Sequence, residues 1–249
     1  MAVGGNEKEE FGGATSCYLV QAGGQTVFLD GGSGLLDAPV TFDAPPAIVL
    51  THLHLDHVLG LGMYPRLSQK GLRTDLYVPA EDAAGALAAL NGLYSPPFWP
   101  LSLKDYAGDV RIHPLTLPLQ IGDLRIEGMP GCHPGGCLVL KLLYEGRSMV
   151  LATDFEHEEP FFSELAAFAK DADLLLYDGQ YTEAEYGSRR GFGHSTAAKG
   201  VELMDRCGAK RLLLIHHDPS RTDAQLASMG AAIGRETVRF ARAGETISL

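Results

Sequence analysis

Four residues of metal-ligand type stand within six positions of the segment THLHLDH, directly after the apolar run of residues 47–50. His52 and His54 are two positions apart, so on an extended segment they share one face. Asp56 and His57 follow where the chain turns. Imidazole and carboxylate groups are good ligands for zinc, iron and manganese. The spacing therefore suits two metal ions, one held by each pair.

Further ligand-type residues follow other apolar runs. His133 comes after LRIEGM, Asp154 ends SMVLATD, and His216 ends RLLLIHH. Folds of the α/β class place their sites at the carboxyl ends of strands, so we expect these side chains to complete the metal site. Cys132 and Cys137 flank His133 and remain open as additional ligands, although their spacing matches no zinc motif.

Apolar runs separated by glycine turns predict the elements that position these residues. Each half of the chain has several strands followed by helices, which predicts an αββα sandwich of two mixed β-sheets with helices on the outer faces. We expect residues 1–249 to form a single domain. The predicted strands cover residues 16–21, 25–30, 47–51, 75–80, 110–115, 124–130, 137–145, 148–154, 173–179 and 211–217, with two short ones at the end, and the predicted helices cover 81–92, 158–170, a stretch from about 195, and 222–234.

The segment THLHLDH resembles the H-x-H-x-D-H motif of the metallo-β-lactamase superfamily, and the three later ligands follow in the superfamily's order. The resemblance covers nearly the whole chain, from the first hairpin to RLLLIHHDP. It implies the metallo-β-lactamase fold with two metal ions, usually zinc, in a cleft between the halves. By the same resemblance His52, His54 and His133 bind one metal ion, Asp56, His57 and His216 bind the other, and Asp154 bridges both.

A second segment, GFGHST, is similar to the stretch that precedes the last metal histidine in the ribonuclease Z and phosphodiesterase branch. In that branch a histidine faces the scissile phosphate, and an acidic residue at the end of the preceding strand orients it. The matching residues are His194 and Asp178. The alternative for His194 is a packing or capping role at the start of the following helix.

The resemblance implies a dinuclear metal-dependent hydrolase, most specifically a phosphodiesterase. Asp56 then binds metal and accepts a proton from the attacking water, while His194 stabilises or protonates the leaving group and Asp178 keeps its ring oriented. Zinc is the expected metal, with manganese or iron as alternatives. Whether Arg189, Arg190 and the proline-rich segment 93–106 contact the substrate stays open.

The substrate is expected to be a small phosphodiester such as a cyclic nucleotide. The formal net charge is −11 and the acidity is spread along the chain, so we do not expect a large nucleic acid partner. The interval between Asp154 and His194 also leaves no room for the long basic arm of ribonuclease Z. The alternatives are a carboxylic-ester, thioester or lactone hydrolase of the same fold, and a non-catalytic, metal-stabilised nucleotide-binding module.

The acidic N-terminal segment has no apolar signal region, and no apolar run approaches the roughly 18 residues of a membrane span. These features predict a cytoplasmic protein whose four cysteines are reduced thiols. A homodimer is an open alternative.

Overall fold

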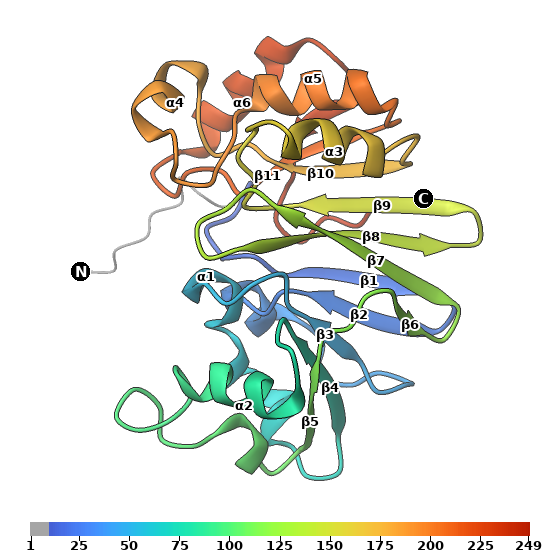
Figure 1. Ribbon diagram of the computed structural model, residues 1–249, viewed down its shortest axis with the longest axis vertical. Coiled ribbons are helices and arrows are strands. Elements are labelled where there is room, and N and C mark those ends of the chain that lie inside the picture. The colour runs from blue at the N-terminus through green and yellow to red at the C-terminus, as the bar shows by residue number, and fades with distance from the viewer. Residues whose placement is uncertain (1–9) are drawn as a thin grey trace. The chain divides into compact units, whose positions relative to one another are not determined.

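The computed structural model describes residues 10–249 (Figure 1). The chain divides into two compact units, one of residues 14–126 and the other of residues 10–13 with 127–249.

The unit of residues 14–126 is built on a five-stranded mixed sheet in the order β1-β2-β3-β4-β5. β1 and β2 form an antiparallel hairpin, and β2, β3, β4 and β5 pair in parallel. Two α-helices, α1 and α2, follow strands β3 and β4. The elements are β1 (Tyr18–Ala22), β2 (Gln25–Leu29), β3 (Ala47–Val49), α1 (Leu55–Val58), β4 (Arg73–Val78), α2 (Ala83–Asn91) and β5 (Asp109–Pro114).

Apolar residues of this unit occupy buried positions in its core. All three residues of β3 are buried, as expected for a parallel strand covered on both faces. Segment 93–106 packs three of its rings inward, with Tyr94 edge-on to Trp99 at 5.5 Å and the Trp99 indole N–H donating to Tyr106. The fourth aromatic ring, Phe98, is 75% exposed.

Most of the seven-stranded sheet β12-β11-β10-β9-β8-β7-β6 belongs to the other unit. Strand β6 and the first residues of β7, up to Ile126, belong to residues 14–126. Strands β9 to β12 pair in parallel, and β8 pairs antiparallel to β9. Figure 1 shows α3, α5 and α6 on one side of this sheet, and their apolar side chains share one core with its strands. The elements are β6 (Leu119–Ile121), β7 (Leu124–Gly131), β8 (Cys137–Tyr144), β9 (Arg147–Ala152), α3 (Phe161–Phe168), β10 (Leu174–Asp178), α4 (Glu183–Arg189), α5 (Ala197–Cys207), β11 (Leu212–Ile215), α6 (Asp223–Ile233) and β12 (Val238–Phe240).

Three sequence predictions need correction here. The predicted elements leave residues 180–194 without a helix, but Thr182 and Glu185 form a capping box that starts helix α4 there. Within residues 10–249 only one of the two short C-terminal strands forms, β12. β11 ends at Ile215 and His216 has a φ of 55°, so His217 does not continue an extended strand.

Asp173, just before β10, makes the stability of the fold depend on pH. It is 5% exposed, and hydrogen bonds from Lys210 and from the Ser148 N–H lower the pKa of Asp173 to about 2. A carboxyl group in an unfolded chain has a pKa near 3.9, so the folded protein favours the ionised form and gains stability above that value. This stability is lost as pH falls from about 4 towards 2.

We expect Asp173→Asn to lower the free energy of unfolding at pH 7, because it removes the charge that stabilises the fold. The expected loss is only about 1–2 kcal/mol, since both cationic partners are partly solvated. Urea unfolding at several pH values measures the effect. The difference between wild type and variant should narrow below pH 4, and a difference that stays constant with pH would contradict this account.

Among residues 10–249 no helix is both long enough and apolar enough to cross a membrane.

Candidate metal centre

The first group of ligand-type residues lies on the loop that follows β3. His52 and His54 precede α1, and Asp56 and His57 lie within it. The rings of His52 and His57 are 4.1 Å apart between centroids, and those of His52 and His54 are 4.6 Å apart. The Asp56 carboxylate lies 3.3 Å from His57 Nε2. The short turn into α1 thus gathers all four side chains of the motif.

Asp30, which the sequence analysis missed, organises this loop from the end of β2. Its carboxylate lies 2.8 Å from His57 Nδ1 and accepts hydrogen bonds from the backbone N–H and the hydroxyl of Thr51. The Thr51 hydroxyl lies 3.1 Å from His52 Nδ1. Since that hydroxyl donates to Asp30, it accepts from His52, and the network assigns the Nδ1–H tautomer to both rings. The Nε2 atoms of His52 and His57 are then unprotonated, which is the form in which an imidazole binds a metal ion.

A close backbone approach holds Asp30 and the motif loop together. Asp30 has a φ of 63°, and Gly31 and Gly32 follow it. A Cβ at Gly32 would lie 2.2 Å from the Asp56 carbonyl oxygen. Only glycine therefore lets the two loops meet at this point.

The second group lies at the carboxyl ends of the parallel strands β9, β10 and β11. Asp154 follows β9, Asp178 ends β10 and His216 follows β11. Because these strands run in parallel, their carboxyl ends meet at one edge of the sheet. Asp154 Oδ1 lies 3.5 Å from His216 Nε2. Asp154 and His216 both have positive φ, a backbone conformation that residues other than glycine adopt rarely.

His133 approaches the same edge from the turn after β7. Its Nε2 lies 3.9 Å from Asp154 Oδ1, and its Nδ1 donates to the carbonyl oxygen of Gly193 at 2.9 Å. This hydrogen bond leaves the Nε2 lone pair free of a proton and directs it towards Asp154.

His194 stands against this group without being one of the predicted ligands. Its Nδ1 lies 2.8 Å from Asp178 Oδ2 and 3.9 Å from Asp154 Oδ1, and its ring stacks on that of His216 at 5.0 Å. Asp178 is fully buried and also accepts from the backbone N–H groups of Gln180 and Ser195. The carboxylate is thus fixed from three sides and holds the His194 ring in one orientation.

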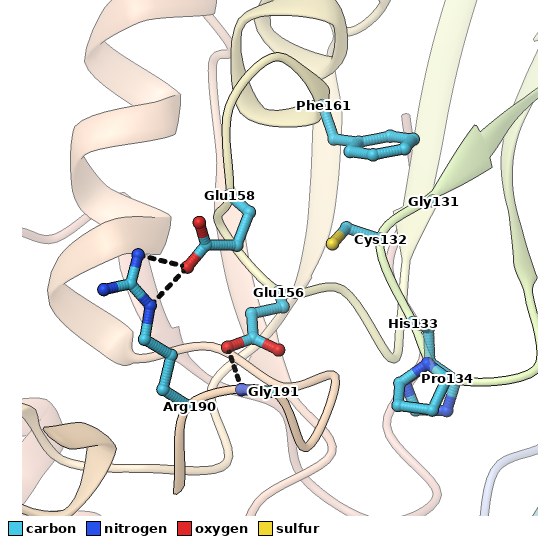
Figure 2. Close-up of a pocket in the computed structure, with 9 residues that line it drawn as sticks. All are labelled: Gly131, Cys132, His133, Pro134, Glu156, Glu158, Phe161, Arg190 and Gly191. Carbon is cyan, nitrogen blue, oxygen red and sulfur yellow. Dashed lines mark hydrogen bonds and ion pairs between the residues drawn. The ribbon is translucent and has the colours of Figure 1, made fainter. Parts of the chain in front are cut away.

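Glu156, drawn beside Gly191 in Figure 2, was also missed from the sequence. It joins the loops that carry His133 and His194. Its carboxylate is 3% exposed and accepts hydrogen bonds from the backbone N–H groups of Gly191 and Gly193 at 2.7 and 2.9 Å. Its own N–H donates to the Cys132 carbonyl. The Tyr186 hydroxyl donates to Glu156, and burial together with this carboxylate raises the pKa of Tyr186. Tyr186 therefore remains a hydrogen-bond donor.

The other candidates have different surroundings. Cys132 faces a cavity of about 640 Å³ lined also by His133, Glu158 and Phe161, and burial raises the pKa of its thiol (Figure 2). Neither Cys132 nor Cys137 belongs to a group of potential metal ligands in the described part of the chain.

Two further histidines have structural partners. His113 bonds to Asp75 and stacks on Tyr77. His157 bonds to Ser195, and burial lowers the pKa of its imidazole.

The donor chemistry of each unit fits divalent metal ions. In the unit of β9–β11, ligand atoms of His133, Asp154 and His194 lie within 4.8 Å of one another, and so do those of Asp178, His194 and His216. Neutral imidazoles fixed by a second hydrogen bond, together with buried carboxylates, are the usual ligands of zinc, manganese and iron. The division of seven ligands between two metal ions stays a prediction.

The sequence pattern of the beta-lactamase superfamily domain matches residues 27–217, more than three quarters of the chain. The chain belongs to the metallo-β-lactamase superfamily. Its two mixed sheets are those of the metallo-β-lactamase fold, and the chain is a metallo-hydrolase of this superfamily.

Several relatives align with most of this chain. A probable metallo-hydrolase of Bacillus subtilis, YhfI, is 26% identical over 87% of this chain and 88% of its own length. Ribonuclease TTHA0252 of Thermus thermophilus is 30% identical over 77% of this chain, which spans 46% of that ribonuclease. The crystal structure of a diphosphatase from the PhnP family has the same fold, with a TM-score of 0.70 and 19% identity over 94% of this chain and 84% of that one.

Proposed function

We propose that this metallo-hydrolase is a phosphodiesterase that acts on a small phosphodiester. The observation that carries the proposal is the hydrogen bond between His194 and Asp178, beside Asp154 and His216. An oriented imidazole, in addition to the proposed metal ligands, suits a reaction that must protonate the alkoxide leaving group of a phosphodiester. The ribonuclease and diphosphatase names among its relatives agree with this chemistry.

We propose that His52, His54 and His133 hold one metal ion, that Asp56, His57 and His216 hold the other, and that Asp154 serves both. Zinc is the metal we expect, and two such ions supply an activated water and neutralise charge on the phosphoryl oxygens. Asp30 and Gly193 fix the tautomers of His57 and His133, so that their Nε2 atoms point away from the supporting hydrogen bonds.

Side chains of the protein carry out the proton transfers. Asp56 accepts the proton of the attacking water. His194 keeps Nδ1 bonded to Asp178, so the proton it delivers to the leaving oxygen is on Nε2. Asp178 holds the ring and stabilises its charged form.

A small substrate suits the charge and the loops of the chain. The net charge is −11, which opposes the approach of a long polyanion. Between Asp154 and His194 the chain forms only α3, β10 and α4 with their short connections. A ribonuclease activity on a large RNA is the second candidate, favoured by the relative from Thermus thermophilus.

Substrate turnover by the zinc-reconstituted protein tests the proposal. We expect hydrolysis of the p-nitrophenyl ester of thymidine 5′-monophosphate, little hydrolysis of p-nitrophenyl phosphate, and none of a lactone. Asp154→Asn, which removes the shared carboxylate, is the control for contaminating hydrolases and should be inactive. Turnover of the lactone without turnover of the phosphodiester would overturn the assignment, and a strong preference for a structured RNA would replace the small substrate by a large one.

A further inference from the structure

Two adjacent arginines precede the glycine-containing turn that leads to His194, and the structure gives them different surroundings. Arg190 lies against Glu158, with a nitrogen-to-oxygen distance of 2.7 Å, as Figure 2 shows. This hydrogen bond raises the pKa of Arg190. Its charge is already matched by a carboxylate.

Arg189, the last residue of α4, lies between aromatic rings. Its guanidinium carbon is 5.7 Å from the centre of the Tyr181 ring and 5.9 Å from that of Phe192. Such contacts orient a guanidinium without neutralising it. Within residues 10–249 no ion pair joins Arg189 to a carboxylate, whereas Arg190 and Arg221 each have one. Acidic residues outnumber basic ones in this chain, 31 to 20, so an unpaired arginine is unexpected.

Arg189 has only a weak effect on the pKa of a carboxylate, that of Asp218. Burial is the largest single influence on the pKa of Asp218 and raises it. Hydrogen bonds from Ser220 and the charges of Arg221 and Arg189 together lower the pKa, and Arg189 comes last among these causes. Arg189 therefore keeps a net positive charge that is held in place and is available to an anion.

The position of this charge relates it to the reaction. The Tyr181 ring that lies under Arg189 also meets the His194 ring edge-on, 5.9 Å away between centroids. Arg189 and His194 thus contact the same aromatic ring. Arg189, Tyr181 and Phe192 form one cluster. Phe192 is 55% exposed, so the Arg189 side of this cluster is open to solvent.

We propose that Arg189, Tyr181 and Phe192 form a subsite for a second phosphate group of the substrate. The inference rests on the proposed phosphodiesterase function and narrows it, because a planar guanidinium binds a phosphate through two parallel hydrogen bonds. The substrate is then a small phosphodiester that carries another phosphate, such as a phosphorylated dinucleotide, in preference to a cyclic mononucleotide.

A matched pair of substrates tests this subsite. Thymidine 5′-(p-nitrophenyl phosphate) and the same compound with a 3′-phosphate share the base and the scissile bond and differ by one phosphate. We expect wild-type kcat/KM to be at least tenfold higher for the compound with the 3′-phosphate, mainly through KM, since charge-assisted hydrogen bonds are roughly twice as strong as neutral ones. Arg189→Ala should abolish this preference, and Arg189→Lys should keep part of it.

Arg190→Ala is the matched control, because it removes a neighbouring arginine near the same helix end and should leave the preference unchanged. A preference that survives in Arg189→Ala, or that Arg190→Ala removes equally, would overturn the subsite. Equal turnover of both compounds by the wild type would also overturn it while the proposed function stands. Turnover of neither compound by the zinc-loaded protein would count against the phosphodiesterase function and this subsite together.

Discussion

The variant His194→Ala is expected to lose about 10²- to 10⁴-fold in kcat for a phosphodiester with an alkoxide leaving group, the usual contribution of a positioned general acid. The hydrogen bond of 2.8 Å to Asp178 fixes the ring, so alanine removes both the proton donor and the positive charge near the leaving oxygen. Metal content should be unchanged, because His194 is not among the seven proposed ligands.

Two controls separate catalysis from folding. His113→Ala removes a histidine that bonds to Asp75 on the other sheet, and it should retain activity. Asp178→Asn keeps the side-chain volume but loses the charge, and it should lie between wild type and His194→Ala. If His194→Ala loses a metal ion, the residue acts as a ligand, and if it retains full activity, the proposed role is wrong.

Gly193→Ala is the second variant with a large expected effect. Gly193 has a φ of 88°, and a Cβ there would lie 2.1 Å from His133 Nδ1 and 2.4 Å from Pro134 Cδ. The same residue accepts the hydrogen bond that sets the His133 tautomer. Displacing His133 should release the metal ion that this histidine is proposed to hold and lower kcat/KM by about 100-fold, the order expected for a misplacement near 1 Å.

Gly191→Ala is the control for backbone strain. Gly191 lies on the same turn with a φ of 85°, donates to the same Glu156 carboxylate, and has no atom within 4 Å of its added Cβ. Gly191→Ala should lose about 1–2 kcal/mol of stability because of the positive φ, but its Cβ does not collide with another residue. Metal content by elemental analysis distinguishes the two variants. Equal metal content in both would show that the contact with His133 does not matter.

The sequence predicted where those candidate ligands lie that follow strands. Apolar runs such as those before Asp154 and His216 identify buried parallel strands, and the carboxyl ends of parallel strands share one edge. The histidine motif itself is unusual enough to stand out in any chain. Pattern and spacing are therefore sufficient where a ligand directly follows a strand.

The supporting residues could not be found in the same way. Asp30 precedes two glycines, which is the usual composition of a turn, and only the fold brings it to His57. Glu156 sits among other acidic residues, and its partners are backbone N–H groups of a turn more than thirty positions away. Helix α4 has no buried residue and contains a glycine, so it lacks an apolar period, and only its capping box signals it.

The leaving-group dependence of the His194→Ala effect tests the central claim most directly. The methyl and p-nitrophenyl esters of thymidine 5′-monophosphate differ only in the group that departs, and p-nitrophenolate departs without needing a proton. If His194 protonates the leaving oxygen, the loss in kcat should be at least tenfold larger for the methyl ester than for the p-nitrophenyl ester. Equal losses for the two esters would contradict the assignment of His194 as the acid of a phosphodiesterase.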